Sequence, residues 1–278
     1  MAKPSRLKDL FRHDLAAQEL SLLPTSYDVV GDILIFSDFP EELKSKERMI
    51  AKQILDSFRH IKVVCKKTGK FGGEFRTPKL RILGGRRSKE TIHVENGIRV
   101  ALHVEKVYFS ARLGHERERI NHLVQPGEKV LVMFSGCGVY PINLAKNSKA
   151  SLIYGIEKNP VAHEYALENI RMNKIENVTL LKGDVRTQLP KLEISFDRMI
   201  MPLPKSAGTF LDVALPKLRK DGILHFYDFR HDTEFTQAET DLVTACKKLG
   251  RKCDILSTTK CGQFGPGKYR ICIDARIR

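Results

Sequence analysis

From about residue 130 onward, short apolar runs alternate with helix-like segments, and this alternation constrains the fold more than any other feature of the sequence. Strands that alternate with helices build a parallel sheet from βαβ units. A helix is expected from Pro160 to Lys174, because Asn159 suits the N-cap and proline suits the first helical position. The expected strands are 130–134, 151–157, 178–184, 197–202 and 221–229.

Two more strand-like runs, 253–260 and 268–277, follow an expected helix at about 233–249, and we expect them to close the sheet as a hairpin. The first hundred residues differ, since they mix helices and strands in the manner of a small α+β domain. Helices are expected at 4–20 and 40–58, and strands at 29–36, 61–67, 79–85 and 91–105. We therefore predict an N-terminal α+β domain over residues 1–98 and an α/β domain over residues 99–278.

The net charge of +15 and the pI near 9.6 favour a polyanionic partner, because neutralised phosphates release counterions that drive binding. General solubility is the alternative explanation for such a charge. Cations gather in the loops of the N-terminal domain and predict a phosphate-binding face, although a solvated loop has the same composition. They are Lys66, Lys67, Lys70, Arg76, Lys79, Arg81, Arg86 and Arg87.

No apolar run approaches the roughly 18 to 20 residues that a membrane span needs, and the N-terminus lacks the apolar core of a secretory signal. We therefore expect a cytoplasmic protein. The six cysteines form no CxxC pair and no Cys/His cluster, so neither a metal site nor a disulfide framework is indicated. Reduced and mostly buried thiols are expected.

A cofactor site is predicted where the strand at 130–134 runs into the turn Ser-Gly-Cys-Gly, residues 135–138. Small residues allow close approach of the backbone to a ligand, and Glu157, at the end of the next strand, can accept hydrogen bonds from ribose hydroxyls. Asp184 ends the third strand and can accept from an adenine amino group. The third glycine of the dinucleotide motif GxGxxG is missing, which favours S-adenosylmethionine. The alternative is that both acids are ordinary strand-end carboxylates.

Seven collinear stretches resemble the archaeal and eukaryotic tRNA (guanine-37-N1)-methyltransferases and their relatives in wybutosine synthesis. They are 26–35, 72–80 with GGEFRTPKL, 91–97, 104–120 with YFSARLGHERERI, 155–178 with the Asn-Pro helix start, 183–186 and 201–215. The resemblance spans almost the whole chain. It implies a Rossmann-like class I methyltransferase domain, S-adenosylmethionine as the cofactor, and N1 of guanosine 37 in tRNA as the target.

The resemblance also implies roles for single residues. The family's catalytic arginine falls on Arg76 and its general base on Glu116. Both types fit the chemistry, since N1 must lose a proton and the charge developing on O6 must be stabilised. Contacts to the cofactor are expected from Arg112, Phe134, Ser135, Gly136, Gly138, Glu157, Lys158, Asp184, Val185, Pro202 and Pro204. Contacts to RNA are expected from Lys66, Lys67, Arg86, Arg87 and Tyr108, with Phe109 and Tyr140 as further candidates for base stacking.

At two positions the sequence departs from the family pattern. Val132 stands where an acidic residue is common, and Pro202 replaces an asparagine that helps to hold the target base. Proline has neither an amide side chain nor a backbone N–H group.

Several functions stay open at this point. We expect a monomer that binds the anticodon stem-loop of tRNA, without a metal ion and away from membranes. The closest alternative is transfer of the 3-amino-3-carboxypropyl group to the wybutosine precursor at the same tRNA position. A non-catalytic tRNA-binding protein is a second alternative, and a methyltransferase for small molecules or proteins is a third.

Overall fold

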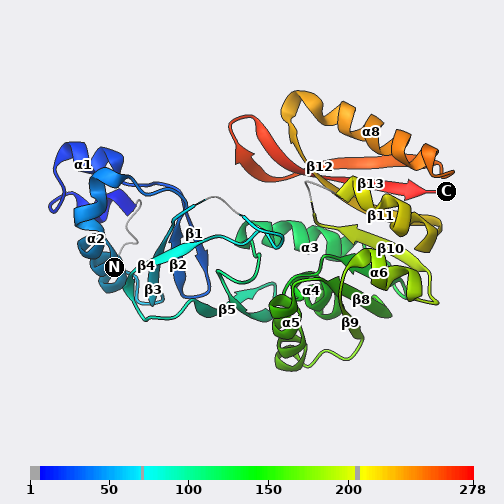
Figure 1. Cartoon of the computed structure of the whole chain (residues 1–278), viewed down its shortest axis with the longest axis horizontal. Helices are drawn as coiled ribbons and strands as arrows, with labels where there is room; N and C mark the ends of the chain where they lie inside the picture. Colours follow the sequence, from blue (N-terminus) through cyan, green and yellow to red (C-terminus); the bar gives the residue numbers. More distant parts are fainter. Residues whose placement is uncertain (1–6, 70–71, 204–206) are drawn as a thin grey trace. The chain divides into compact units, whose positions relative to one another are not determined.

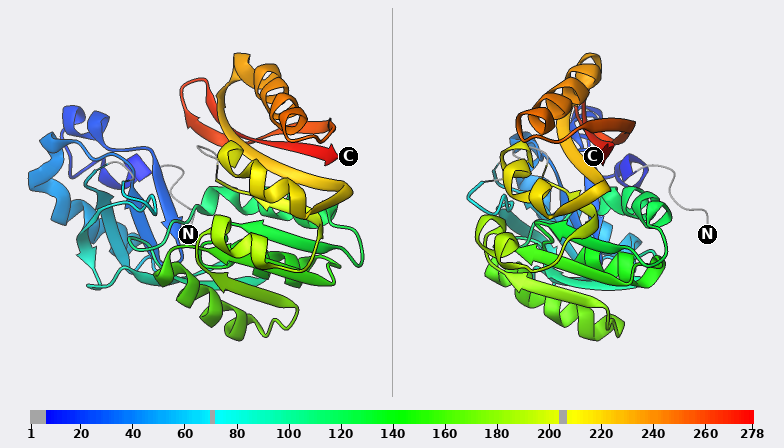
Figure 2. Two further views of the ribbon diagram at one scale, coloured as in Figure 1. Left: turned by 45° about the vertical axis from the view of Figure 1, so that its right-hand side comes forward. Right: turned by 90° about the vertical axis from the view of Figure 1, so that its right-hand side faces the viewer.

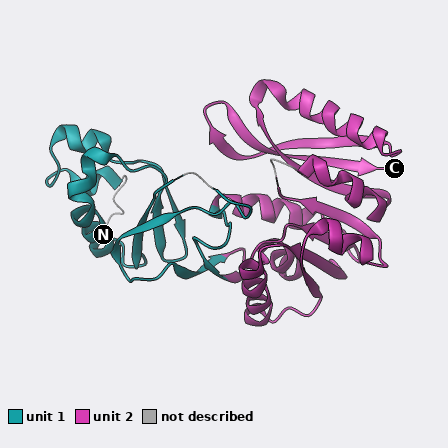
Figure 3. Cartoon of the chain, in the orientation of Figure 1, with its two compact units in different colours: residues 1–94, 101–111 teal, residues 95–100, 112–278 magenta. Residues whose placement is uncertain are grey.

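The computed structural model describes residues 7–69, 72–203 and 207–278, which form two compact units (Figures 1 and 3). Unit 1 comprises the chain up to Val94 together with Ala101–Ala111. Unit 2 comprises Glu95–Val100 and Arg112–Arg278. The expected boundary between residues 98 and 99 falls in the hairpin through which the chain passes from one unit to the other and back.

Unit 1 is built on a four-stranded sheet of order β1-β2-β3-β4, in which only β2 and β3 run parallel. Helix α2 carries Ile50 and Ile54 on its buried face, and both belong to the apolar core of this unit. The elements are η1 (Leu7–Phe11), α1 (Ala17–Leu22), β1 (Tyr27–Val30), β2 (Ile33–Phe36), η2 (Glu41–Lys46), α2 (Glu47–Ser57), β3 (Val63–Lys67) and β4 (Leu80–Gly85).

Three expected elements of this region are wrong. The expected helix at 4–20 is two short helices, η1 and α1, in the described part of that range. The expected strand at 29–36 is the hairpin β1–β2, because Gly31 has a φ of 55° and turns the chain. Likewise, the expected strand at 91–105 is two strands, β5 (Glu90–Glu95) and β6 (Ile98–His103). Asn96 and Gly97 join them with φ values of 44° and 74°, which is the backbone of a tight hairpin turn.

Unit 2 contains a seven-stranded sheet of order β12-β13-β11-β10-β7-β8-β9. Its helices lie on both faces of the sheet (Figure 2). The α-helices of this unit and the strands of this sheet are α3 (Gly114–Leu123), β7 (Lys129–Met133), α4 (Val139–Asn147), β8 (Leu152–Glu157), α5 (Pro160–Asn173), β9 (Val178–Lys182), α6 (Val185–Gln188), β10 (Phe196–Met201), α7 (Leu211–Ala214), β11 (Leu218–His231), α8 (Phe235–Lys248), β12 (Cys253–Gly265) and β13 (Lys268–Ile277).

The strand directions of unit 2 confirm the predicted fold class. Strands β7 to β11 are parallel, whereas β13 runs antiparallel to both β11 and β12. A parallel sheet with one such terminal hairpin is the Rossmann-like class I methyltransferase fold. The start of α5 is also as expected, since the Asn159 side chain accepts a hydrogen bond from the Val161 N–H at 3.0 Å and Pro160 is the first helical residue.

Two expectations from composition can be compared with the described residues. All six cysteines are free thiols, and only Cys261 is not buried. Within the same residues, no helix combines the length and the apolar character needed to cross a membrane.

The ion pair of Arg117 with Glu95 provides a test of the packing of unit 2. Arg117 is 2% exposed, binds both Glu95 oxygens and lies over the Tyr140 ring. We expect Arg117→Ala to lower the free energy of unfolding by about 3–5 kcal/mol, because it leaves a buried carboxylate without its cation. Urea denaturation measures the change. Glu118→Ala, on the exposed side of the same helix, is expected to stay within about 0.5 kcal/mol of the wild type. Equal effects of the two variants would contradict this account.

Candidate cofactor and catalytic site

The turn after β7 has the backbone of a ligand-binding loop. Phe134, Gly136 and Gly138 have φ values of 58°, 57° and 80°, and the Ser135 N–H donates to the Ile156 carbonyl at 3.0 Å. A Cβ atom on Gly138 would lie 3.0 Å from the Cβ of Ala166 in α5. Glycine is therefore favoured at this position, because a side chain would need both a left-handed backbone and a small displacement of Ala166. The turn passes directly into α4.

Glu157 fixes this turn from the neighbouring strand. Its Oε2 accepts from the Gly136 N–H and its Oε1 from the Asn159 N–H, both at 2.7 Å. Burial raises the pKa of Glu157, while these backbone hydrogen bonds oppose the rise. A carboxylate oxygen can accept more than one hydrogen bond, so each oxygen retains capacity for a ligand hydroxyl.

Asp184 follows β9 and caps α6, since its Oδ1 accepts from the Arg186 N–H at 2.9 Å. The ammonium group of Lys158 donates to its Oδ2 at 2.9 Å and lowers the pKa of Asp184. Lys158 and Asp184, both predicted cofactor contacts, are thus brought together. Val185, the first residue of α6, is buried.

The Phe134 side chain packs edge-on against Phe210, with ring centroids 4.8 Å apart, and the guanidinium group of Arg186 lies 5.1 Å from the Phe210 ring. Sequence reasoning did not identify Phe210 or Arg186 as neighbours of the site, because neither is part of a motif with a recognisable spacing.

Among the remaining predicted cofactor contacts, Pro202 follows β10, which pairs in parallel with β7 and so ends at the same edge of the sheet as the glycine turn. Pro202 is partly buried, and Arg112 is exposed just before α3. Pro204 lies outside the described residues, as does Lys70 of the predicted phosphate-binding face. Val132 is fully buried inside β7, so its side chain contributes packing at the position where the family often has an acid.

Glu116, the predicted base, projects from α3 and is 5% exposed. Its Oε1 and Oε2 accept hydrogen bonds from Arg119, each at 2.8 Å, and Oε1 also accepts from the Tyr227 hydroxyl at 2.6 Å. The carboxylate is shielded from solvent, so these partners and not bulk water determine its environment. Neither partner was predicted.

Arg76, the predicted catalytic cation, lies in unit 1 in a loop closed by the bridge between Gly72 and Thr77. Its φ of 50° is unusual for a residue with a side chain. Strained backbone of this kind is concentrated at functional sites. The positive φ of Arg76 is therefore consistent with a functional role for this residue.

The predicted RNA contacts of unit 1 differ in their exposure. Lys66 is buried, 2.6 Å from a Glu47 oxygen, and is the least available to a phosphate. Lys67 is half-buried, whereas Arg86 and Arg87 are exposed, and Arg86 lies 3.2 Å from Asp32. Tyr108 is exposed and Phe109 packs against His93. In unit 2, Tyr140 is buried with its hydroxyl 3.2 Å from that of Tyr227, which leaves no ring face for a base.

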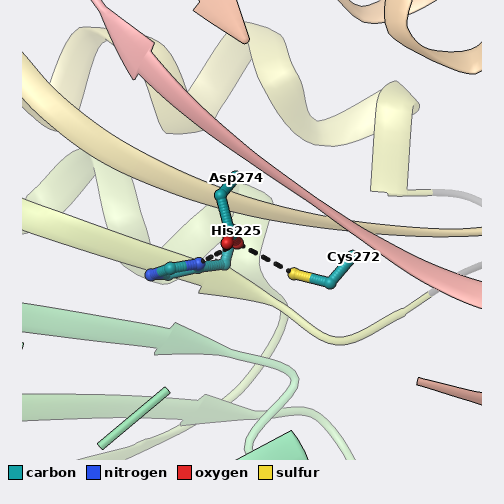
Figure 4. Close-up of side chains that lie close together, drawn as sticks. All are labelled: His225, Cys272 and Asp274. Atoms are coloured by element: carbon teal, nitrogen blue, oxygen red, sulfur yellow. Dashed lines mark hydrogen bonds and ion pairs between the residues drawn. The ribbon is translucent and has the colours of Figure 1, made fainter. Parts of the chain in front are cut away.

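His225, Cys272 and Asp274 form a buried cluster whose ligand-type atoms lie within 4.8 Å of one another (Figure 4). The two imidazole nitrogens are already engaged, Nδ1 with Asp274 at 2.6 Å and Nε2 with Arg198 at 2.7 Å. The Asp274 carboxylate is also 2.6 Å from Arg119. Two guanidinium groups already bind the imidazole and the carboxylate, so these contacts form an ion-pair network.

Family models match both parts of the chain. The TRM5/TYW2 methyltransferase domain matches residues 91–256, and the TYW2 N-terminal domain matches residues 7–88. The chain belongs to the TRM5/TYW2 methyltransferase family. This membership confirms the resemblance inferred from the sequence.

Among curated relatives, the tRNA (guanine(37)-N(1))-methyltransferase Trm5b of Pyrococcus abyssi is 40% identical over 262 residues, which cover 94% of this chain and 77% of the relative. The tRNA(Phe) (4-demethylwyosine(37)-C(7)) aminocarboxypropyltransferase of Methanocaldococcus jannaschii is 33% identical, and the match covers 90% of this chain and 97% of the relative. Both branches named in the sequence analysis are thus represented.

Solved members of the family have the same fold. The structure described as the complex of aTrm5 and tRNALeu has a TM-score of 0.86 and 31% identity, and covers 100% of this chain and 80% of that chain. TYW2 from Methanocaldococcus jannaschii, solved in complex with AdoMet, has a TM-score of 0.69 and 28% identity, and covers 91% of this chain and 99% of that chain.

The glycine turn generates a test with an internal control. Gly138 and Gly127 have similar φ values, 80° and 83°, but a Cβ atom on Gly127 would meet nothing within 4 Å. We expect Gly127→Ala to cost about 1–2 kcal/mol through backbone strain. Gly138→Ala is expected to cost more, because its methyl group also contacts α5. Urea denaturation of both variants measures the difference, and an equal loss would show that the contact with α5 is unimportant.

Proposed function

We propose that this protein transfers a methyl group from S-adenosylmethionine to N1 of guanosine 37 in tRNA. The observation that carries the proposal is the presence, in one unit, of the glycine turn braced by Glu157 and of the buried Glu116 carboxylate on α3. The family membership and the 40% identity to a tRNA (guanine(37)-N(1))-methyltransferase support it.

The residues at the carboxyl ends of β7, β8 and β9 fit the cofactor. Gly136 and Gly138 allow close approach of the backbone to the ligand, Glu157 would accept from the ribose hydroxyls, and Asp184 would accept from the adenine amino group. When bound, S-adenosylmethionine supplies an activated methyl group. The protein therefore needs to bind and orient the two substrates and to accept a proton.

The proton is the task assigned to Glu116. Guanine N1 carries a proton that must leave as the N1–CH₃ bond forms, and a carboxylate placed beside N1 can accept it. Arg76 would stabilise the negative charge that develops on O6, since its guanidinium group stays protonated throughout.

The RNA partner is assigned from charge and from the family. The net charge of +15 suits a polyanion, and Arg86 and Arg87 expose guanidinium groups on unit 1. We propose that unit 1 contacts the anticodon stem-loop of tRNA, in the cytoplasm, and that the protein acts as a monomer. Splaying the target base out of its stack costs a few kcal/mol, which stacking and edge contacts would offset.

Transfer of the 3-amino-3-carboxypropyl group is the second candidate. Residues 7–88 match the TYW2 N-terminal domain, and the chain covers 97% of an aminocarboxypropyltransferase but 77% of Trm5b. The same cofactor and the same tRNA position serve both reactions. They differ in which carbon of the sulfonium faces the nucleophile.

Nucleoside mass spectrometry distinguishes these reactions. The protein is incubated with S-adenosylmethionine and a tRNA transcript that contains guanosine 37, and we expect one added methyl group on that guanosine. Glu116→Ala and Arg76→Ala should each reduce the rate by about 10²-fold, because each removes one contribution to the transition state. Glu118→Ala, an exposed change on the same helix, should leave the rate unchanged.

The outcomes separate the candidates. An aminocarboxypropyl adduct on tRNA that already carries the wybutosine precursor would assign the second reaction. Tight tRNA binding without a product on either RNA would favour the non-catalytic alternative. Methyl transfer that survives both substitutions would refute the roles of Arg76 and Glu116.

Binding of tRNA tests the role of unit 1. We expect the combined change Arg86→Ala and Arg87→Ala to weaken binding and to reduce the slope of log K against log salt by about 0.7 for each phosphate that is no longer neutralised. Lys44→Ala, which removes an exposed lysine of η2 that is paired with Glu41, is the matched control. Filter binding at several salt concentrations measures both. An unchanged slope in the double variant would place the RNA elsewhere.

A further inference from the structure

We infer that Asp274 is a positioning residue for the methyl transfer. Through the half-buried Arg119, it allows Glu116 to take up a proton while the Arg119 cation keeps an anionic partner. The inference rests on the proposed function, because it takes Glu116 as the group that accepts the N1 proton. Asp274 lies outside the stretches that resemble the family, and Arg119 lies within one of them but was given no role from sequence.

Six titratable groups from several elements lie near Glu116. Arg119 comes from α3, Tyr140 from α4, Tyr227 from β11, Cys261 from β12, and Cys272 and Asp274 from β13. Burial raises the pKa of both tyrosines and of both cysteines, so these four groups are neutral. Among these groups, the ionised ones are therefore one cation, Arg119, and one anion, Asp274.

Arg119 is held between two carboxylates. Its Nε and Nη2 donate to Glu116 at 2.8 Å, and its Nη1 donates to Asp274 at 2.6 Å. Burial opposes the charge of the guanidinium group, but the hydrogen bonds to Glu116 and Asp274 raise the pKa of Arg119. With both carboxylates ionised, the cation has one more anionic partner than it needs. When Glu116 becomes neutral, Asp274 still balances Arg119.

Asp274 is itself fixed as an anion. Burial raises its proton affinity, yet the hydrogen bonds from His225 and Arg119 hold the pKa of Asp274 well below its usual range. The direction of the His225 bond follows from its other partner, because Arg198 can only donate and so His225 Nε2 must accept. Nδ1 then carries the proton and donates to Asp274 at 2.6 Å (Figure 4).

The network ends at a second anion. Arg198 is 3% exposed, and its Nε and Nη2 donate to the Glu128 carboxylate at 2.7 and 3.0 Å. Burial lowers the pKa of His225, so the imidazole stays neutral. The network thus alternates in charge around one neutral ring, in the order Glu128, Arg198, His225, Asp274, Arg119 and Glu116. Protonation of Glu116 changes the net charge of the whole network from −1 to zero.

Atoms and charge balance in the transfer step. The N1–CH₃ bond forms as the bond from the methyl group to sulfur breaks, and sulfur keeps that electron pair and loses its positive charge. The N1 proton passes to Glu116, which becomes a neutral acid. The positive charge that leaves sulfur is thereby taken up by a site that already holds an excess of one negative charge, and later exchange with water returns the proton to solution.

The test uses single-turnover methyl transfer by the full chain on the guanosine 37 transcript, followed across pH. Asp274→Asn removes the negative charge but keeps the size of the side chain. In the plot of rate against pH for this variant, we expect the plateau to be about 10-fold lower. We also expect the acid limb, where the rate falls as pH decreases, to shift by about one unit to lower pH, because a lone cation beside Glu116 makes it a weaker base.

Tyr227→Phe gives the opposite sign. Its hydroxyl donates to the Glu116 carboxylate at 2.6 Å, so its removal makes Glu116 a stronger base and moves the acid limb to higher pH. Thr258→Ala is the control, since Thr258 lies on β12 and donates to Glu239 of α8, outside the network. Affinity for S-adenosylmethionine, measured for every variant, should be unchanged and reports that unit 2 is folded.

Opposite shifts of the acid limb in the two variants, with an unmoved control, would support the inference. The inference would be overturned if the wild type methylates the transcript but the pH profile of Asp274→Asn is unchanged or shifts in the same direction as that of Tyr227→Phe. The proposed function would then remain intact. A wild type that transfers no methyl group would overturn the proposed function itself, and the inference with it.

Discussion

The packing of unit 2 depends on arginines that are buried or half-buried against carboxylates. Arg117 binds Glu95, Arg119 binds Glu116 and Asp274, and Arg198 binds Glu128. A buried ion is destabilising unless its partners satisfy it, so each pair fixes the elements that carry it with little freedom to shift. Through these pairs, α3 is tied to β13, and β10 to the chain before β7. The same constraint that holds α3 in place also fixes the orientation of the Glu116 carboxylate.

The cofactor turn is stabilised by a different device. Each oxygen of Glu157 accepts one hydrogen bond from a backbone N–H group, that of Gly136 or that of Asn159. Asn159 in turn caps α5, and Ala166 of that helix lies so close to Gly138 that a side chain there would have to displace it. The turn, the carboxylate and the helix therefore specify one another. A ligand would meet a surface that is already organised, which reduces the entropy lost on binding.

The sequence predicted the parallel sheet well and the small unit less well, for physical reasons. Strands β7 to β11 are buried runs separated by helices, and their period is unambiguous. In the first hundred residues, the turns at Gly31 and at Asn96-Gly97 interrupt runs that are apolar on both sides, so each hairpin resembled one long strand. The dipeptide Asn-Gly is a typical hairpin signal, but residues 91–105 were nevertheless expected to form one strand. The helix expected at 4–20 failed because a continuous apolar pattern does not show where a short helix stops.

The site divides along the same line. Glu157 and Asp184 were identified as candidates because a strand end is a local feature of the sequence. Tyr227 and Asp274 were not identified, because 111 residues separate Glu116 from Tyr227 and 155 separate Arg119 from Asp274. Arg119 is only three residues from Glu116, but the sequence did not show that it joins Glu116 to Asp274. Their meeting depends on the register of β11 against β13, which pairs His225 with Asp274 and Tyr227 with Cys272. A shift of that register by one residue would turn all of these side chains to the other face of the sheet and leave Glu116 without its partners. The partners of the proposed catalytic carboxylate therefore depend on strand pairing between residues far from it in the sequence, where no local motif records them.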